Sequence, residues 1–202
     1  MDEDKFQELH ISLGHRDLTT VDPSVVPLQA FHRVVELNLA NNSIRDLTFL
    51  KSYCSLRTLI LDGNELSHTT RFPPLQSLTT LTLNKNKIAS VPMLLNSLSL
   101  SFPNLTFLSL LANDGVPSYL NNHTAVEYAD YRQLVIARLP KLQFLDDTPV
   151  TDEERAASAE HFGEPKEPKS PNRSPRGSFI RRTESGKRTS RTSISKRESA
   201  LL

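Results

Sequence analysis

The residues of this 202-residue chain that could perform acid–base or metal chemistry are few and scattered. Cys54 is the single cysteine, and the six histidines, at positions 10, 15, 32, 68, 123 and 161, have no ligand spacing among them. Zinc sites need several Cys or His ligands at short, regular spacing, and a lone cysteine cannot form an internal disulfide. The sequence therefore predicts no metal site and no cofactor, and it favours a reducing, intracellular compartment.

One carboxylate pair, Asp146-Asp147, has the residue types for general acid–base catalysis. The pair directly follows a strand-like segment, so we interpret it as a polar turn that ends the strand. The chain contains no G-x-S-x-G nucleophile elbow, no H-E-x-x-H zinc helix and no glycine-rich phosphate loop. The sequence therefore predicts a protein that is not an enzyme.

The elements that would position any site are repeats. Three segments, VVELNLANNSI (34–44), LRTLILDGNEL (56–66) and LTTLTLNKNKI (78–88), share the form L-x-x-L-x-L-x-x-N-x-L/I at a period of 22 residues. This is the leucine-rich repeat pattern. Each L-x-L predicts a short strand with its leucines inward, and successive strands should stack into a parallel sheet. The repeat asparagines should be buried and bonded to backbone groups of the bend: Asn42, Asn64, Asn86 and Asn113.

The pattern continues less regularly on both sides. LHISLGHRDL (9–18) fits with Ile11, Leu13 and Leu18 but has Arg16 in place of the asparagine. LTFLSLLAND (105–114) fits with Leu105, Leu108, Leu110 and Asn113. Between the regular repeats, VPMLLNSLSLSFP has leucines suited to a helix on the convex side. A longer insertion, AVEYADYRQLVIAR (125–138), also has helical spacing.

A closing cap is predicted from YRQLVIARLPKLQFLDDTPVTDEER (131–155), because the last repeat would otherwise expose its leucines. Thr151 and Glu154 have the spacing of a helix capping box. The last strand is expected to contain Leu139, Leu142, Phe144 and Leu145.

The predicted fold class is thus an α/β solenoid of leucine-rich repeats, with short parallel strands on the concave face, a helical C-terminal cap and a disordered tail. We expect an N-terminal cap and degenerate first repeat over 1–33, repeats over 34–124, the cap over 125–160 and the tail over 163–202.

The segment from Tyr131-Arg132 through LPKLQFLD to Glu154-Arg155 resembles the cap of a set of intracellular leucine-rich repeat proteins. The set includes the A-prime protein of a spliceosomal ribonucleoprotein, acidic nuclear phosphoproteins and axonemal assembly factors. Within it, LTLNKNKI, the long helical third repeat, LTFLSLLAND and DYRQLVIARLPKLQFLD are most similar to a branch associated with melanocyte differentiation. The resemblance covers 34–155 and implies a noncatalytic adaptor whose partners are a Rab GTPase of melanosome biogenesis and endosomal recycling machinery. The first repeat and the tail depart from that branch, so cell type and cargo do not carry over.

The concave face is the predicted place of partner binding. Its exposed positions are mostly small and uncharged, but Ile60, Phe107 and Leu111 are apolar and have no internal use there. Singly scattered apolar residues are normal on surfaces, whereas grouped ones on a repeat protein indicate docking. We predict a docking patch of Ile60, Phe107 and Leu111, with Asn38 and Thr82 beside it.

The tail differs from the body in charge. Residues 1–164 carry 13 Lys/Arg and 20 Asp/Glu, whereas residues 165–202 carry 11 and 3. Serine-proline motifs at Ser170 and Ser174 suit proline-directed kinases, and basic residues precede Ser190, Ser193 and Ser199 at the spacing that basophilic kinases favour. We therefore predict phosphorylation at these five serines. The positive charge suits binding to an anionic membrane. Phe179 is the only aromatic residue interleaved with the arginines of the tail, which argues against stacking on nucleic-acid bases. A solvated linker is the alternative interpretation.

Two functions remain open from the sequence. One is a cytoplasmic adaptor, peripheral on endosomal membranes, and the other is a nuclear ribonucleoprotein scaffold. The acidic opening MDEDKFQE predicts no secretory signal, and no stretch reaches the roughly 18 apolar residues that a membrane-spanning helix needs. The long third repeat favours the adaptor.

Overall fold

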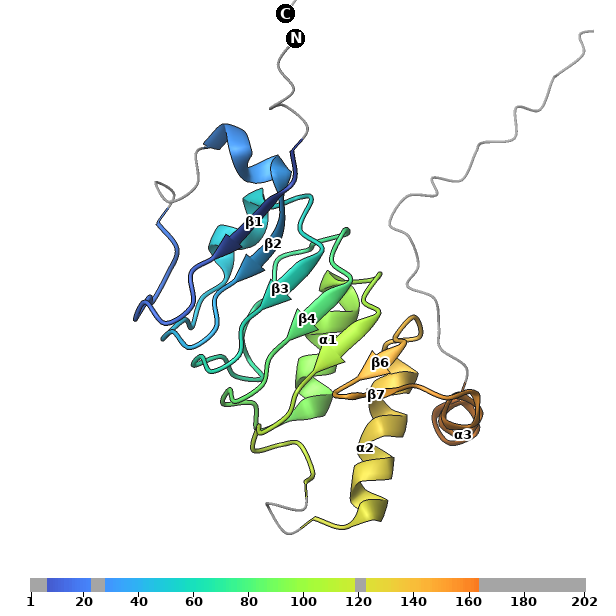
Figure 1. Ribbon diagram of the computed structural model, residues 1–202. Helices are drawn as coiled ribbons and strands as arrows, with labels where there is room; N and C mark the ends of the chain where they lie inside the picture. The colour runs from blue at the N-terminus through green and yellow to red at the C-terminus, as the bar shows by residue number, and fades with distance from the viewer. Residues whose placement is uncertain (1–6, 23–27, 119–122, 164–202) are drawn as a thin grey trace, which may run out of the picture. The chain divides into compact units, whose positions relative to one another are not determined.

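The computed structural model describes residues 7–22, 28–118 and 123–163. Within them the chain forms a stack of coils in which each coil contributes one strand (Figure 1). The predicted tail from residue 164 onward lies outside the described residues, and with it lie the five candidate phosphorylation sites, Ser170, Ser174, Ser190, Ser193 and Ser199.

All strands join one sheet in chain order, as the repeat pattern predicts. The first six are parallel, and the last two form an antiparallel hairpin. Leu37, Leu59, Leu81 and Leu108 are direct partners along the sheet, which confirms the predicted register. The strands are β1 (Leu9–Ser12), β2 (Val34–Asn38), β3 (Thr58–Ile60), β4 (Thr80–Thr82), β5 (Phe107–Ser109), β6 (Phe144–Leu145) and β7 (Thr148–Pro149).

The core is a set of leucine rows that run from coil to coil. Leu37, Leu59, Leu81, Leu108 and Leu145 are fully buried, and so are the second leucines of the repeats. Because one short coil cannot bury its own leucines, each coil depends on the coils on either side for its hydrophobic stabilisation.

The repeat asparagines form the predicted ladder. Asn64 accepts from the Ile44 amide at 3.0 Å and donates to the carbonyls of Leu39 at 2.9 Å and Leu61 at 3.0 Å. Asn86 and Asn113 repeat this arrangement. Asn42 extends it to the first repeat, where Arg16 replaces the asparagine, by accepting from the amides of Arg16 and Leu18.

The asparagine ladder has a second feature, a left-handed turn, that the sequence pattern does not predict. The residue just before each ladder asparagine adopts the left-handed conformation, at φ between 53° and 63°: Asn41, Gly63, Lys85 and Ala112. Glycine or asparagine adopts this conformation at low cost, whereas lysine and alanine do not. The turn is therefore imposed by the ladder bonds that follow it.

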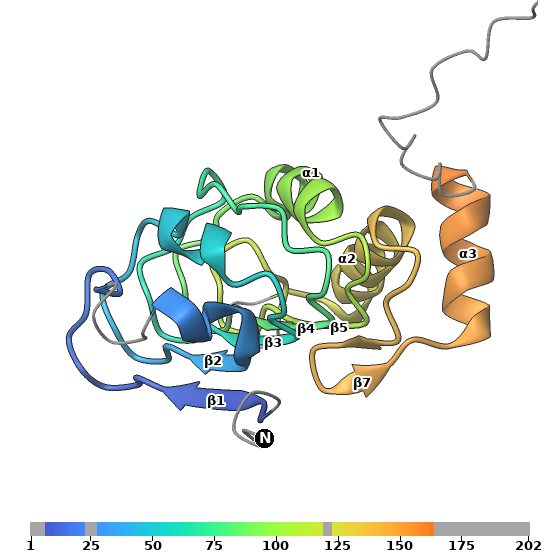
Figure 2. The ribbon, with the colours of Figure 1, turned by 90° about the horizontal axis from the view of Figure 1, so that it is seen from above.

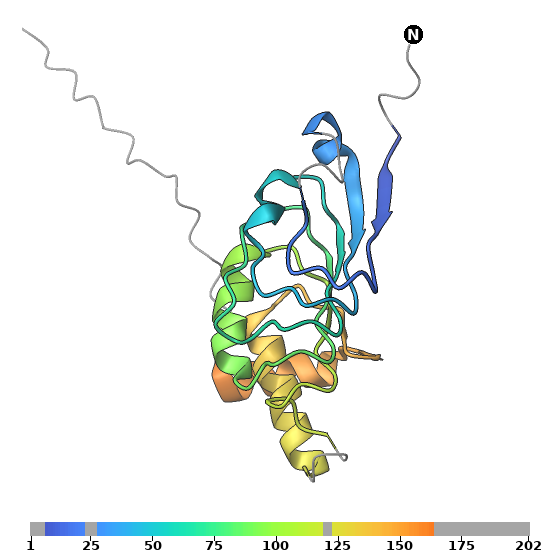
Figure 3. The ribbon, with the colours of Figure 1, turned by 90° about the vertical axis from the view of Figure 1, so that its left-hand side faces the viewer.

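Helices cover the face of the coils opposite the sheet (Figures 2 and 3). Short 3-10 turns, η3 (Leu28–Arg33) and η4 (Thr48–Ser52), serve the early coils, and α1 (Val91–Ser101) and α2 (Ala125–Arg138) serve the later ones. Both predicted insertion helices are confirmed. We call the sheet face turned away from these helices the concave face.

The last helix, α3 (Asp152–Phe162), packs against α2. Its predicted capping box is confirmed: the Thr151 hydroxyl accepts from the Glu154 amide, and the Glu154 side chain accepts from the Thr151 amide. None of the helices in the described ranges is long and apolar enough to cross a lipid bilayer.

Candidate functional site: the concave face and its cap

Two rows of outward side chains cross the concave face, because alternate residues of each strand point away from the core. One row contains His10, Glu36, Thr58, Thr80, Phe107 and Phe144. The other contains Ser12, Asn38, Ile60, Thr82 and Ser109.

An aromatic pair ends the first row. The rings of Phe107 and Phe144 are stacked, with centroids 6.3 Å apart and planes at 29°. Phe144 lies in the last strand, as predicted, and its side chain is 44% exposed. Of the predicted members of that strand, Leu142 and Leu139 are buried before it begins, and only Phe144 and Leu145 belong to it.

The sequence itself indicates the outward position of Phe144. Aligning LQFL (142–145) with LTFL (105–108) places Phe144 at the outward position of Phe107. The sheet confirms that equivalence by pairing these two residues directly.

The structure separates the other predicted anchors. Ile60 is half-buried on β3, two strands from Phe107, which corresponds to about 10 Å. Leu111 lies just beyond β5, is 39% exposed, and is held by a bond from its amide to Asn84 Oδ1 at 2.7 Å. We define the concave patch as Ile60, Phe107, Leu111 and Phe144, with the Phe107–Phe144 pair at its centre.

The polar atoms of the two residues predicted beside the patch face the fold rather than a partner. Asn38 Oδ1 accepts from the Ala40 amide at 2.9 Å. The hydroxyl of Thr82 is fully buried and has no hydrogen-bond partner in the described ranges. A partner that contacts Thr82 would therefore meet its methyl group rather than its hydroxyl.

The amino-terminal half of the concave face is polar. His10 Nδ1 lies 3.0 Å from Glu36 Oε2, and Arg57 Nη1 lies 2.9 Å from Glu8 Oε1. Charged groups thus pair at one end of the face, while the apolar side chains gather toward the other.

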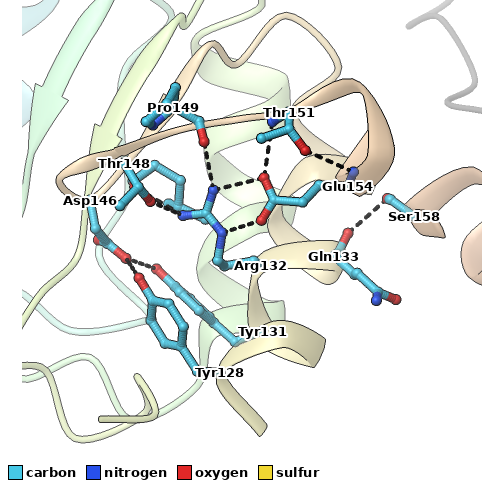
Figure 4. A network of polar contacts seen from close by, with 11 residues as sticks. Tyr128, Tyr131, Arg132, Gln133, Asp146, Thr148, Pro149, Thr151, Glu154 and Ser158 are labelled. Atoms are coloured by element: carbon cyan, nitrogen blue, oxygen red, sulfur yellow. Dashed lines mark hydrogen bonds and ion pairs between the residues drawn. The ribbon is translucent and has the colours of Figure 1, made fainter. Parts of the chain in front are cut away.

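Asp146 anchors the turn that follows Phe144. Its Oδ1 accepts from the Leu110 amide at 2.9 Å, and its Oδ2 accepts from the hydroxyls of Tyr128 and Tyr131, both at 3.2 Å (Figure 4). In earlier coils the equivalent amides, such as that of Leu83, donate to a backbone carbonyl of the next strand. The Asp146 side chain replaces that carbonyl where the chain turns away.

Burial gives this carboxyl an unusual environment. Asp146 is only 2% exposed, and the loss of solvation raises its pKa above the usual value, although its hydrogen bonds oppose the shift. Burial likewise raises the pKa of Tyr131 well above its usual value. The predicted polar turn is thus a turn, but its first carboxylate is buried and structural.

Arg132 is the second anchor of the cap. Its guanidinium donates to Glu154 Oε1 at 2.5 Å and Oε2 at 2.9 Å, to Thr148 Oγ1 at 2.6 Å, and to the carbonyls of Leu145 and Pro149 (Figure 4). Arginine has five N–H donors, so all of them are used. The hydrogen bonds from Arg132 lower the pKa of Glu154.

These contacts fix the hairpin that carries Phe144. Arg132 comes from α2, Leu145 and Thr148 from the hairpin, and Glu154 from α3. Ser158 joins α3 to α2 once more by donating to the Gln133 carbonyl at 2.8 Å. The outward direction of Phe144 therefore depends on the whole cap.

No group of three or more His, Cys, Asp or Glu side chains in the described part of the chain has the arrangement of a metal site. The features that the concave face offers are shape and apolar area, which suit recognition of another macromolecule.

Comparison with known proteins agrees with this fold. A family model described as leucine-rich repeat matches residues 32–170. The chain is 43% identical over 113 residues to human leucine-rich melanocyte differentiation-associated protein, covering 55% of this chain and 57% of that one. It is 36% identical over 135 residues to U2 small nuclear ribonucleoprotein A' of Emericella nidulans, covering 66% and 54%. The chain thus aligns with little more than half the length of these relatives.

Among solved structures, a chain of the Drosophila melanogaster SNF/U2A' complex matches with a TM-score of 0.56 at 18% identity. The match covers 80% of this chain and 91% of that one, and at this identity it speaks for the fold. Together with the leucine rows, the asparagine ladder and the match over residues 32–170, these findings establish that the chain belongs to the leucine-rich repeat family.

Proposed function

We propose that this protein is a noncatalytic adaptor that binds a folded protein through the concave patch. The stacked Phe107–Phe144 pair, in which Phe107 is half-buried and Phe144 is exposed, is the observation that carries the proposal. The inward rows already fill the core, so these rings have no packing role inside the solenoid. Aromatic side chains at the centre of an interface supply a large share of binding energy.

A Rab GTPase or an endosomal recycling complex is the partner class that we propose, with the protein in the cytoplasm and peripheral on endosomal membranes. The support is similarity to the melanocyte differentiation-associated relative, whose 43% identity exceeds that to the ribonucleoprotein relatives. The long third coil with helix α1 was the sequence feature that favoured this branch.

A nuclear ribonucleoprotein scaffold is the second candidate. It is supported by 36% identity to a U2 small nuclear ribonucleoprotein A' and by the fold of the chain from the SNF/U2A' complex. In this alternative the concave patch would hold an RNA-binding protein rather than contact RNA itself.

Proximity labelling separates the two candidates, because they require different neighbours. A biotin-ligase fusion of the full chain should label a set of proteins that the Phe107→Ser/Phe144→Ser variant loses. The matched control is Met93→Ser/Leu100→Ser, which removes two exposed apolar side chains of α1 on the opposite side. Endosomal neighbours would support the first candidate and spliceosomal neighbours the second.

Stability must be measured beside the labelling. The two Phe substitutions lie on the surface and should change the free energy of unfolding by about 1 kcal/mol or less. A neighbour set that the phenylalanine variant retains in full would contradict binding through the patch. Loss of the set in the α1 variant instead would move the site to the convex side.

We propose that the basic tail adds a second, electrostatic contact, with anionic membrane as its target and phosphorylation at the five serines as its control. The net charge of +8 over residues 165–202 supports this. Deleting 165–202 should weaken binding to phosphatidylserine vesicles at low salt and have little effect at high salt, because salt screens exposed charges. Equal vesicle binding with and without the tail would contradict this contact.

A further inference from the structure

Helix α1 (Val91–Ser101) has a solvent-facing side without charge. It contains no charged residue, whereas every other α- or 3-10 helix in the described ranges contains at least one. The helix lies on the outside of the coils, opposite the strands (Figure 2). Surface helices normally carry charged and polar side chains on the face turned to water. The outer face of α1 therefore lacks the composition of an ordinary exposed helix.

Two large apolar side chains project from this outer face. Met93 is 52% exposed and Leu100 is 76% exposed. They are seven positions apart, so they lie on one side of the helix, about 10 Å apart along its axis. Apolar residues scattered singly on a surface are normal, but two on one uncharged ridge indicate a contact. We call this ridge, with the exposed Asn96 between the two, the α1 face.

Two cations lie directly beside the α1 face. Arg138, at the end of α2, donates from Nη1 to Asn96 Oδ1 at 2.6 Å. Lys141 donates from Nζ to Asn104 Oδ1 at 2.6 Å, just beyond the end of α1. Both acceptors are neutral amides, so the positive charges are positioned by these bonds but not neutralised.

A third cation lies at the end of α1. The carbonyl of Phe72 accepts from Ser101 Oγ at 2.8 Å, which places the preceding Arg71 beside the last turn of the helix. Arg71 and the two cations beside the α1 face are exposed, and none forms an ion pair with a carboxylate of the described residues. The segments that surround the α1 face, 71–75, 96–104 and 138–141, are all described. The apolar ridge is thus bordered by positive charge.

We propose that the α1 face contacts an anionic lipid membrane, with Met93 and Leu100 entering the headgroup region. Arg71, Arg138 and Lys141 would then lie against lipid phosphates, which is the pairing of apolar and basic groups that interfacial helices use. A convex ridge with two projecting side chains fits a deformable lipid surface. A protein partner would need a matching surface of about 800 Å² on each side. The inference goes beyond the tail contact, because it assigns a membrane contact to the folded solenoid.

A fluorescent probe on the ridge tests the contact directly. The chain contains no tryptophan, so Leu100→Trp gives the full chain a single indole at the α1 face. With vesicles of phosphatidylcholine and phosphatidylserine, its emission should shift to shorter wavelength and be quenched by brominated lipid. Val126→Trp is the matched control: Val126 is 68% exposed but lies at the opposite end of α2 from Arg138, so its emission should not change.

Charge removal tests the border of the ridge. The triple variant Arg71→Gln/Arg138→Gln/Lys141→Gln should bind phosphatidylserine vesicles about tenfold or more weakly, because each cation near an anionic surface contributes about fivefold. The control removes the same charge from the turns that follow the strands and should change binding by less than about threefold. It is Arg45→Gln/Lys85→Gln/Lys87→Gln.

Loss of the apolar side chains should have a different salt dependence. Met93→Ser/Leu100→Ser should lose the vesicle binding that the full chain retains at high salt, where the tail and the other charges are screened. The vesicles contain no protein, so none of these results depends on the concave patch or its partner.

Three outcomes would overturn the membrane contact. The first is an unchanged Leu100→Trp emission while the chain sediments with vesicles, because the tail alone would then bind. The second is equal vesicle binding by wild type and the triple variant of the border cations. The third is a Leu100→Trp emission that responds to polyglutamate and not to vesicles, which would assign the α1 face to an acidic protein.

Discussion

Asp146 and Glu154 are two carboxylates of one cap whose pKa values are shifted in opposite directions. Burial raises the pKa of Asp146 above its usual 3.8, whereas the bonds from Arg132 lower that of Glu154 below its usual 4.5. The difference is physical: Asp146 accepts from neutral donors, and Glu154 accepts from a charged guanidinium.

Glu154→Gln should remove an acid-sensitive part of the stability. A carboxyl whose folded pKa is lowered stabilises the fold above its unfolded pKa, and this contribution is lost as pH falls through the folded value. At pH 7 the variant should unfold with a free energy about 1.5–3 kcal/mol below wild type, because a hydrogen bond to a charged group is replaced by a neutral one. Urea titrations should show this difference shrinking as pH falls below 4.5.

Asp146→Asn is the control with the opposite sign. A raised folded pKa contributes stability below the unfolded pKa of 3.8, and that contribution is lost as pH rises through the folded value. The asparagine variant lacks this loss, so its stability relative to wild type should improve between pH 3 and pH 7. Parallel pH profiles for both variants would contradict the assigned shifts.

At the scale of the coil, the asparagine ladder imposes a conformation that the preceding residue does not prefer. Asn41, Gly63, Lys85 and Ala112 share a positive φ although they are different residue types. A repeat can thus vary in sequence at this position, because the two bonds of each asparagine amide and the bond to its oxygen hold the bend.

Exchanging glycine and alanine at two equivalent turns tests this point. Gly63→Ala should lower the free energy of unfolding by about 1–2 kcal/mol, because a left-handed alanine is strained and its Cβ would lie 2.4 Å from Asn41 Oδ1. Ala112→Gly should raise it by about 0.5 kcal/mol, since relief of strain exceeds the added freedom of the unfolded chain. Urea midpoints that move the same way for both variants would contradict the conformational argument.

For the whole molecule, the cap covers the apolar core of the last repeat, as a further repeat would otherwise do. Leu108 and Leu110 are buried, and the next layer of the core consists of Tyr131, Val135, Leu142 and Leu145. Because every coil buries its leucines against neighbours, the last one needs a layer that belongs to no repeat.

Truncation after residue 130 should therefore expose the last leucine row and yield aggregated protein, whereas truncation after residue 163 should leave the melting temperature unchanged. The second boundary keeps α3, whose Ser158 and Glu154 bond to α2. Size-exclusion chromatography and thermal unfolding of both fragments provide the measurement. A soluble, cooperatively folding fragment 1–130 would show that the cap is not required.

The sequence by itself determined the coils and their register. The 22-residue period placed Leu59 and Leu81 side by side, and the same pattern predicted the buried ladder asparagines and the two insertion helices. These features depend on local periodicity and on equivalent positions in adjacent coils, which one chain displays along its length.

Only the tertiary structure decided which polar groups of the cap bond to one another and which apolar residues meet. Arg132, Asp146 and Glu154 lie as far as 22 positions apart. Nothing in their residue types says that Asp146 is buried among neutral donors while Arg132 pairs with Glu154. Phe144 reaches the concave face beside Phe107, and Ile60 lies two strands away, because β6 pairs with β5 after a 34-residue excursion of the chain. Such contacts depend on where a non-repeating segment returns to the sheet, and hydrophobic periodicity carries no information on that return.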